Sequence, residues 1–326
     1  MSRIKQLILS TALLTGALTG IVANASNANS EMSDQTVHYQ VTAVDGVNVF
    51  YREAGDPRNP TLLLLHGFPT SSQMFRNLIP RLAGKYHLIA PDYPGFGQSS
   101  QPDRSQFAYT FDNLSLVIEH FVEAVGVSQF ALYAMDYGAP IGFRLATRHP
   151  ERVTALIIQN GNAYDEGLQE FWAPLKQYWS DNSPTSRDAL RPFLTLGGTM
   201  WQYTQGVPNV TSLSPDAWTT DQYCLDRAGN NEIQLDLFYD YRNNVALYPV
   251  WHTYFRSYQP PTLIVWGKND PIFPAQGAEA FKRDLTNLDF HLLDTGHFAL
   301  ESNGAEIADL MLKFLARNLS GNATKQ

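Results

Sequence analysis

The five residues AMDYG (134–138) decide the fold of this chain. They lie between Phe130–Met135, an apolar run typical of a buried strand, and Ala139–Arg148, which has helical spacing and ends before Pro150. Small residues on both sides of a reactive residue are typical of a strained strand-to-helix turn, because the two backbones approach closely there. Asp136 occupies the reactive position. An ordinary Asp that caps the following helix would fit these five residues equally well.

Strands and helices alternate on both sides of this turn. Asp45-Gly46 joins the first two strands as a hairpin turn, because Asp-Gly favours the backbone conformation that such turns require. The alternation further along the chain predicts a mostly parallel central sheet with helices on both faces. The expected strands are 37–44, 47–53, 61–65, 86–90, 130–135, 153–159, 262–266 and 289–293, and the expected helices are 111–125, 139–148, 275–284 and 305–318.

The alternation stops between about residues 162 and 258. This stretch is mostly helical where it is periodic, and it is dense in tyrosine and tryptophan. We expect an α/β core formed by residues 36–161 and 259–320, with residues 162–258 inserted as a helical cap. Most of the aromatic side chains are expected to pack the cap onto the core.

Two further residues lie where a nucleophile on the turn at Asp136 would need its catalytic partners. Asp270 follows a late strand and His297 follows the last strand, so the chain order is nucleophile, acid, histidine, as in the α/β-hydrolases. The loop His66-Gly67-Phe68-Pro69 follows an early central strand, where backbone N–H groups that stabilise an oxyanion belong. We expect Asp136, Asp270 and His297 to form a catalytic triad, and His66 to hold the loop.

An aspartate in the nucleophile position changes the reaction that this triad can perform. A carboxylate that attacks an alkyl carbon forms an ester on its own side chain, whereas a serine would form an ether that water cannot cleave. Water deprotonated by His297 can then attack the ester carbonyl of Asp136. Asp270 would hold His297 as a neutral base in the required tautomer. The leaving group is either an epoxide oxygen, which needs a proton donor, or a halide, which needs only N–H donors.

From about Val47 to Leu315 the chain resembles the epoxide hydrolase and haloalkane dehalogenase branch of the α/β-hydrolases. The HGFP loop resembles the H-G-x-P of epoxide hydrolases, which implies that Phe68 and Tyr137 supply the oxyanion N–H groups. The Asn and Trp that haloalkane dehalogenases often carry at these two positions are absent. Fluoroacetate dehalogenases usually have Arg after the nucleophile, and Tyr137 departs from that pattern.

The segment Asp240-Tyr241-Arg242-Asn243 resembles the one that bears a ring-opening tyrosine in epoxide hydrolases. The resemblance makes Tyr241 the candidate proton donor, although fluoroacetate dehalogenases carry a similar D-Y-R whose Tyr binds halide. A second tyrosine of epoxide hydrolases aligns with Leu175 here. The candidates for its place, and for the substrate pocket in general, are Tyr164, Tyr178 and Tyr203, and Phe298 is a further pocket candidate.

The favoured function is an epoxide hydrolase that gives a vicinal diol. The alternatives are a haloalkane or haloacid dehalogenase, a carboxylesterase or lactonase that uses Asp136, and a non-catalytic small-molecule receptor that kept the scaffold. Turnover of any epoxide would separate enzyme from receptor, and halide release would identify a dehalogenase.

Composition limits the partners of this 326-residue chain. A net charge of −8 does not attract nucleic acid or anionic membranes. No His, Cys, Asp or Glu cluster has metal-ligand spacing, and no Gly-rich phosphate loop occurs, so we expect neither a metal nor a cofactor. Cys224 is the single cysteine, which excludes an internal disulfide. The expected partner is a small-molecule substrate, and the oligomeric state stays open.

The N-terminus has the order of a secretory signal peptide. Arg3 and Lys5 precede an apolar run that ends in Ala23-Asn24-Ala25, a small-x-small cleavage site. We expect residues 1–25 to be removed and residues 26–35 to form a flexible tail. The mature protein would then be periplasmic or secreted and would not be membrane-bound.

Overall fold

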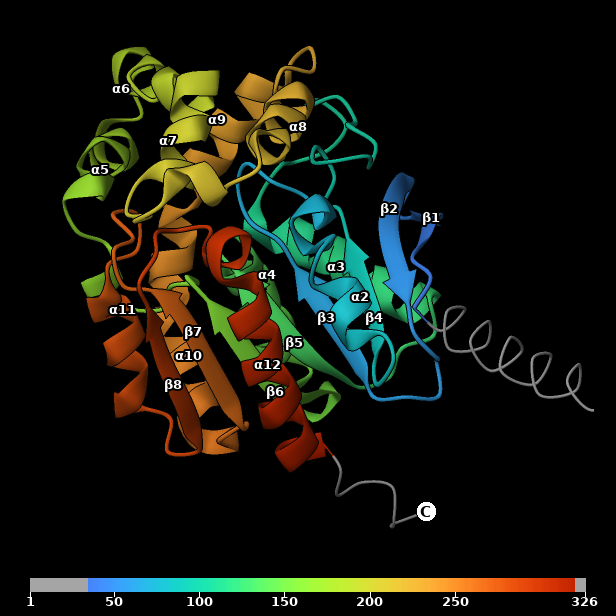
Figure 1. Cartoon of the computed structure of the whole chain (residues 1–326). Coiled ribbons are helices and arrows are strands. Elements are labelled where there is room, and N and C mark those ends of the chain that lie inside the picture. Colours follow the sequence, from blue (N-terminus) through green and yellow to red (C-terminus); the bar gives the residue numbers. More distant parts are fainter. Residues whose placement is uncertain (1–34, 320–326) are drawn as a thin grey trace, which may run out of the picture.

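The computed structural model describes residues 35–319, which form an eight-stranded sheet in the order β1-β2-β4-β3-β5-β6-β7-β8 (Figure 1). Strand β2 pairs antiparallel with β1 and with β4, and all other neighbours are parallel. The predicted mostly parallel sheet is therefore confirmed. The strands are β1 His38–Val44, β2 Val47–Ala54, β3 Thr61–Leu65, β4 His87–Pro91, β5 Phe130–Met135, β6 Val153–Gln159, β7 Thr262–Gly267 and β8 Leu288–Leu293.

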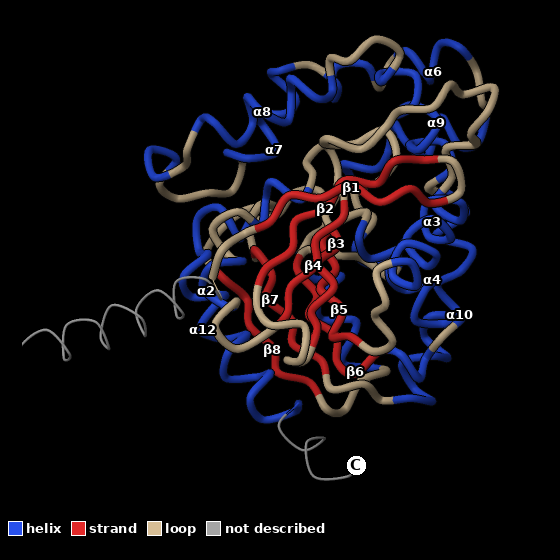
Figure 2. The backbone as a smooth tube through the Cα atoms, turned by 90° about the vertical axis from the view of Figure 1, so that its right-hand side faces the viewer, coloured by secondary structure: helices blue, strands red, loops and turns tan. Residues whose placement is uncertain are grey.

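The core lies on both faces of the sheet, because successive side chains of a strand point to opposite faces. Along β5, Phe130, Leu132 and Ala134 belong to one apolar cluster, whereas the alternate residues Tyr133 and Met135 belong to the other. Figure 2 shows the two helical layers, with α3, α4 and α10 on one side of the strands and α2 and α12 on the other. Every residue of β5 is buried, as the continuous apolar run predicted.

The helices that flank the sheet have identifiable start and stop signals. The side chain of Thr110 caps α3 by accepting from the Asn113 N–H, and Gly126, with a φ of +75°, follows its end. Helix α12 bends at Asn303, whose backbone is not helical. The flanking helices are α2 Ile79–Leu82, α3 Phe111–Ala124, α4 Gly138–Arg148, α10 Arg242–Tyr258, α11 Ala275–Ala280 and α12 Ala299–Leu319, with short 3-10 turns at Ser72–Phe75, Pro150–Arg152 and Phe281–Arg283.

The chain between β6 and β7 is helical, and most of it lies above the sheet in Figure 1. Its last helix, α10, returns to the core, where Trp251 and Phe255 pack against Phe143 of α4 with ring centroids 5.5 and 5.2 Å away. The range 162–258 expected to form the cap therefore ends in a helix of the flanking layer. The other helices of this segment are α5 Ala173–Asp181, α6 Pro184–Asp188, α7 Leu196–Thr204, α8 Pro215–Leu225 and α9 Asn230–Asp240, with 3-10 turns at Asp165–Gly167, Glu170–Trp172, Arg191–Leu194 and Val210–Ser212.

Two predicted helix bounds differ from the structure. The helix expected at 275–284 ends at Ala280 and continues only as a 3-10 turn, and the closing helix begins at Ala299 instead of residue 305. The helix predicted from the sequence begins after Asn303-Gly304 because Asn and Gly are typical of the residues that end a helix. The helix tolerates the non-helical backbone of Asn303 because Ala299 and Leu300 are buried against the core on its far side.

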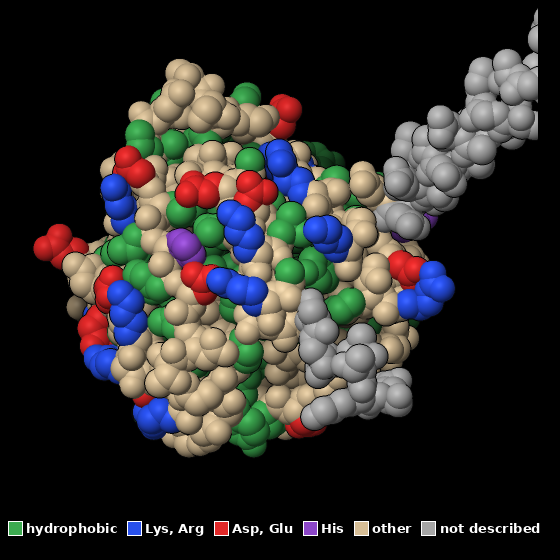
Figure 3. Space-filling model, turned by 60° about the horizontal axis from the view of Figure 1, so that its bottom comes forward, with side chains coloured by type: hydrophobic (Ala, Val, Ile, Leu, Met, Phe, Trp, Pro, Cys, Tyr) green, Lys and Arg blue, Asp and Glu red, His purple; other side chains and the backbone are tan. Residues whose placement is uncertain are grey.

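Residues 1–34 lie outside the described part of the chain, and with them the expected signal peptide and nearly all of the expected tail. Within residues 35–319, no helix is both long and apolar enough to cross a membrane. On the face opposite the cap, acidic and basic side chains are interspersed, and neither sign gathers into one patch (Figure 3).

Gly138→Ala should destabilise the fold. A β-carbon on Gly138 would lie 2.3 Å from the carbonyl oxygen of Leu65, so α4 or β3 would have to move. We expect a loss of about 1–3 kcal/mol in the free energy of unfolding, the usual cost of overpacking. In the control Gly197→Ala, the nearest atom to the new β-carbon is 3.8 Å away on Thr195, so stability should hold or rise. Denaturant unfolding measures both variants, and equal stability in them would contradict the close-approach explanation.

Candidate active site

Asp136 stands on the strained turn between β5 and α4. Its φ is +48°, a left-handed conformation that residues other than glycine rarely adopt. Its backbone N–H donates to the carbonyl oxygen of Asn160 at 3.3 Å. A β-carbon on Gly67 would lie only 2.3 Å from Cβ of Asp136. The loop after β3 can therefore approach Asp136 this closely only with glycine at position 67. The turn therefore presents the Asp136 side chain at the ends of two neighbouring strands.

Backbone N–H groups contact the Asp136 carboxylate. The N–H of Phe68 donates to Oδ1 at 2.6 Å, and the N–H of Tyr137 is a second backbone donor to the carboxylate. These are the two donors that the sequence resemblance implied. The other oxygen, Oδ2, lies 3.8 Å from Nε2 of His297. One oxygen is thus fixed while the other faces the histidine.

His297 joins Asp136 to Asp270. Its Nδ1 lies 2.7 Å from Oδ2 of Asp270, and its buried Nε2 has no hydrogen-bond partner among the described residues. Burial disfavours the charged imidazolium, but the Asp270 carboxylate outweighs it and raises the pKa of His297. Asp270 is fixed in turn by Asn160 Nδ2 at 2.8 Å and by the N–H of Ile272 at 2.7 Å. The structure therefore brings the three predicted triad residues together.

Burial raises the pKa of the Asp136 carboxyl to about 6, although His297 and the N–H groups of Phe68 and Tyr137 pull it down. The carboxylate is partly desolvated, which makes an ionised oxygen a stronger nucleophile than it would be in water. At neutral pH the Asp136 carboxyl is therefore ionised.

Asn160 is a positioning residue that the sequence analysis did not identify. It follows β6 with a φ of +44°. Its carbonyl accepts from Asp136, its Nδ2 donates to Asp270, and its Oδ1 accepts from the N–H of Gly267 at 3.1 Å. One residue, through its backbone carbonyl and its side chain, thus ties the turn at Asp136 to the loop that carries Asp270. The signal in the sequence is the polar QNGN (159–162) directly after a buried strand.

His66 supports the loop that carries Phe68, as expected. Its Nδ1 lies 3.0 Å from the carbonyl of Gly67, its Nε2 accepts from the N–H of Tyr93, and its ring stacks on Tyr93. Burial lowers the pKa of His66 to about 3, so the ring is neutral. His66 is absent from the pocket wall.

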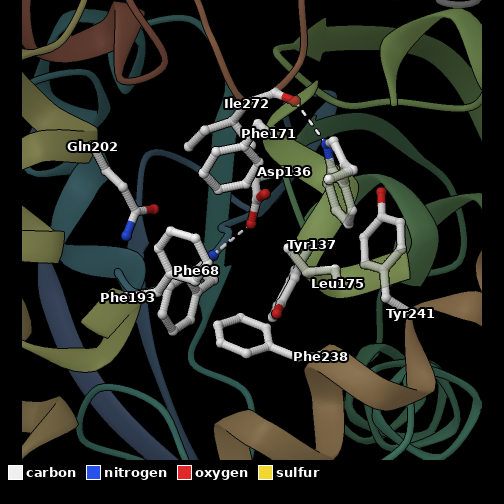
Figure 4. Close-up of a pocket in the computed structure, with 11 residues that line it drawn as sticks. Phe68, Asp136, Tyr137, Phe171, Leu175, Phe193, Gln202, Phe238, Tyr241 and Ile272 are labelled. Atoms are coloured by element: carbon white, nitrogen blue, oxygen red, sulfur yellow. Dashed lines mark hydrogen bonds between the residues drawn. The ribbon is translucent and has the colours of Figure 1, made fainter. Parts of the chain in front are cut away.

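An apolar pocket opens in front of Asp136, with about 430 Å³ of empty space, part of it open to solvent. Figure 4 shows the Asp136 carboxylate among the lining side chains, held by the Phe68 N–H. The cap supplies most of the wall, and neither Lys nor Arg occurs in it. The lining residues are Phe68, Asp136, Tyr137, Phe171, Trp172, Leu175, Phe193, Gln202, Phe238, Tyr241 and Ile272.

Tyr241 brings a phenol to the pocket. Burial, Tyr248 and Asp136 raise the pKa of Tyr241 well above its ordinary value, so it is protonated at neutral pH. Its hydroxyl is hydrogen-bonded to the hydroxyl of Tyr248, whose oxygen accepts from Asn162 Nδ2 at 3.0 Å. Leu175, the residue aligned with the second tyrosine of epoxide hydrolases, lines the pocket and has no proton to give.

The other pocket candidates from the sequence lie outside the pocket wall. Each tyrosine hydroxyl has a polar partner elsewhere: Tyr164 donates to Asp284 at 2.7 Å, and Tyr203 donates to Asp221 at 2.5 Å. The Tyr178 hydroxyl accepts from Arg187 at 2.7 Å, and the Phe298 ring stacks on Tyr203 at 3.9 Å. Tyr164, Tyr178, Tyr203 and Phe298 therefore do not line the pocket in front of Asp136, contrary to the prediction from the sequence.

The indole N–H of the pocket tryptophan is already used. Trp172 donates to the carbonyl oxygen of Ile272 at 2.7 Å. Its neighbour Trp179 donates to the carbonyl of Phe238 at 2.7 Å. Neither N–H is therefore free to bind a leaving group in the pocket. In the part of the chain that the structure describes, no group of His, Cys, Asp and Glu could hold a metal ion.

Residues 60–304 match the sequence profile of the family described as alpha/beta hydrolase fold. The chain therefore belongs to the α/β-hydrolase family, and the predicted α/β-hydrolase fold is confirmed. A haloalkane dehalogenase structure, DbeA from Bradyrhizobium elkani, shares this fold with a TM-score of 0.70 at 22% identity, over 86% of this chain and 100% of that one.

Curated relatives are hydrolases of more than one activity. The chain is 47% identical over 284 residues to an uncharacterized hydrolase of Saccharomyces cerevisiae, covering 86% of this chain and 97% of that protein. It is 36% identical over 152 residues to a haloalkane dehalogenase of Bradyrhizobium diazoefficiens, covering 47% and 48%. It is 28% identical over 240 residues to epoxide hydrolase 3 of Xenopus tropicalis, covering 71% and 64%.

Asp136→Asn should raise the stability of the protein while it removes the nucleophile. An amide avoids the burial of a charge, keeps an acceptor for Phe68 and can donate to Nε2 of His297. Because the pKa of Asp136 rises from 3.8 to about 6 on folding, the ionised group costs up to about 3 kcal/mol above pH 6. The gain should shrink as the pH falls from 6 toward 4, because the folded carboxyl becomes protonated, and it should vanish below 3.8, where the unfolded carboxyl is protonated as well.

Thermal unfolding at pH 8 and at pH 4 measures this gain. Asp294→Asn is the control, since hydrogen bonds from Asn269 and Lys268 lower the pKa of this exposed carboxyl, so its loss should not stabilise. An Asp136→Asn protein no more stable than wild type at pH 8 would contradict the expected cost of burying the charge.

Proposed function

We propose that this hydrolase opens epoxides through an alkyl ester on Asp136. The observation that supports the proposal is that the two oxygens of the Asp136 carboxylate have different surroundings. Oδ1 is held by the N–H of Phe68 at 2.6 Å, whereas Oδ2 lies at the pocket, 3.8 Å from Nε2 of His297. An oxygen that faces the substrate beside an oxygen already in an oxyanion site suits attack followed by hydrolysis at the same group.

The proposed reaction has two steps. Oδ2 of Asp136 attacks an epoxide carbon, the carbon–oxygen bond of the ring breaks, and the released oxygen takes a proton from Tyr241. Water then gives a proton to His297 and attacks the carbonyl carbon of Asp136, so that negative charge develops on Oδ1 between the N–H groups of Phe68 and Tyr137. The acyl carbon–oxygen bond breaks, the departing oxygen takes the proton from His297, and the diol leaves. The proton of the new Asp136 carboxyl returns to the Tyr241 phenolate, and Asp136 keeps one oxygen from water.

The polar groups of the pocket favour an epoxide over a halide. An alkoxide needs a proton, and Tyr241 is a protonated phenol in the wall. A halide needs N–H donors, and the indole N–H of Trp172 is bonded to the Ile272 carbonyl. The relation to epoxide hydrolase 3 supports the same choice. A haloacid would need a cation for its carboxylate, and the wall has neither Lys nor Arg.

Haloalkane hydrolysis is the second candidate. It shares Asp136, His297 and Asp270 with the first, and the relation to haloalkane dehalogenases favours it. Haloalkane hydrolysis does not need a proton from Tyr241, whereas epoxide opening does. A change at Tyr241 should therefore affect only the epoxide reaction.

Single turnover in ¹⁸O-labelled water tests the ester. Product formed in the first turnover should carry an unlabelled oxygen from Asp136, and the label should appear on the peptide that contains Asp136. His297→Gln should stall only the second step, because the attack on carbon transfers no proton to His297. The variant should therefore accumulate an adduct that mass spectrometry places on Asp136.

Asp136→Ala is the control and should give neither adduct nor product. Labelled product in the first turnover, together with an unmodified His297→Gln enzyme, would mean that water attacks directly and that Asp136 is no nucleophile.

Tyr241→Phe should slow ester formation from an epoxide by about 10²–10⁴-fold, the usual effect of removing a general acid. Ester formation from an alkyl bromide should hardly change, because bromide leaves without a proton. Rapid-quench mass spectrometry of the adduct measures both rates. Tyr178→Phe is the matched control, since its hydroxyl is bonded to Arg187 outside the pocket. Equal rates for wild type and Tyr241→Phe on every epoxide would remove Tyr241 from the mechanism.

A further inference from the structure

The pocket contains a polar side chain that the proposed mechanism does not use. Gln202 of α7 lines the pocket and is only 5% exposed, yet its amide has no hydrogen-bond partner among residues 35–319. Three other polar side chains of its helix are satisfied: Thr199 donates to Gln222 at 2.7 Å, Tyr203 donates to Asp221, and Thr204 donates to the Met200 carbonyl. Among the buried polar side chains of α7, Gln202 is the one for which the described part of the chain provides no partner.

The protein offers this amide nothing to bind. Its neighbours in the wall are aromatic, and Phe171 and Phe193 pack against each other with centroids 5.2 Å apart. A buried amide carries two N–H donors and an acceptor oxygen, and leaving them unpaired is unfavourable. A ligand with a polar group at this point would satisfy the amide, whereas a purely apolar ligand would displace its water without replacement.

The position of Gln202 relative to the reacting groups defines which part of a substrate it meets. In Figure 4, Gln202 and Tyr241 lie on opposite sides of Asp136. A substrate whose leaving oxygen is turned to Tyr241 extends its substituent in the opposite direction, toward Gln202. The absence of Lys and Arg from the wall, with Asp136 negatively charged, disfavours an anionic substituent.

We propose that Gln202 is a specificity-determining residue that binds a neutral hydroxyl or carbonyl group on the substrate, remote from the carbon that Asp136 attacks. The proposal rests on the proposed function, because it takes the orientation of the substrate from Tyr241 and Asp136. It makes the natural substrate an uncharged epoxide with an oxygen-bearing tail instead of a plain alkyl epoxide.

The test compares two epoxides on two variants. The substrates are a short terminal alkyl epoxide and the same epoxide with a hydroxyl group at the far end of its chain. Gln202→Met keeps the length of the side chain and removes its polar atoms. It should lower kcat/KM for the hydroxylated epoxide by about tenfold, the value of one hydrogen bond to a buried amide, and leave the alkyl epoxide unchanged or faster.

The control is Gln205→Met, an exposed residue just after the same helix, which should alter neither substrate. Damage to the cap would lower kcat/KM for both substrates by the same factor. The ratio of the two kcat/KM values therefore distinguishes a loss of recognition from a loss of folding. An unchanged ratio in Gln202→Met, or an equal change in Gln205→Met, would overturn the role of Gln202.

A binding experiment separates this inference from the proposed function. The matched inert ligands are an alkanol and the corresponding alkanediol, and quenching of the pocket tryptophan, Trp172, measures their Kd. Gln202→Met should raise the Kd of the diol by about tenfold relative to the Kd of the alkanol. If wild type turns over neither epoxide, the proposed function fails, and this difference in Kd alone decides whether Gln202 recognises a polar group.

Discussion

The close approach of three backbone segments at Asp136 is the constraint on which the rest of the site depends. The turn has a positive φ at Asp136, Gly138 packs against the carbonyl of Leu65, and Gly67 packs against the Asp136 side chain. Only this approach brings the Phe68 N–H within 2.6 Å of the carboxylate. A looser turn would leave the carboxylate solvated and the oxyanion donors out of reach, so catalytic geometry and backbone strain come from the same three contacts.

A chain of buried polar groups transmits this constraint to the other catalytic loops. Asn160 accepts from the nucleophile turn and donates to Asp270, which fixes Nδ1 of His297. Each link is buried, and an unpaired polar group in such a place is expensive. The triad is therefore oriented by hydrogen bonds between loops that follow β5, β6 and β7 and the final strand, β8. Removal of the Asn160 side chain would take away the hydrogen bond from one of these four loops to Asp270.

The sequence predicted the core well because its signals are local. Every predicted strand exists, since buried parallel strands are continuous apolar runs, and Asp136, Asp270 and His297 are recognisable as polar residues just after such runs. The pocket wall was predicted poorly, because the cap holds many aromatic residues whose direction depends on tertiary partners. Tyr203 turns to Asp221 and Tyr164 to Asp284, and no local pattern distinguishes them from Tyr241. Gln202 gave no signal, because an unpaired amide is visible only in three dimensions.

The bond from Trp172 to the carbonyl of Ile272 has a consequence for how this family diversifies. It joins the 3-10 turn Glu170–Trp172 of the cap to the loop that carries Asp270, and it occupies the indole N–H of a residue in the pocket wall. A change in that loop that removed the carbonyl acceptor would release an indole N–H beside an unaltered nucleophile. Under the proposed mechanism, backbone far from Asp136 in sequence would then choose between expelling an alkoxide and expelling a halide. Neighbouring lineages could exchange one chemistry for the other while they keep Asp136, Asp270 and His297.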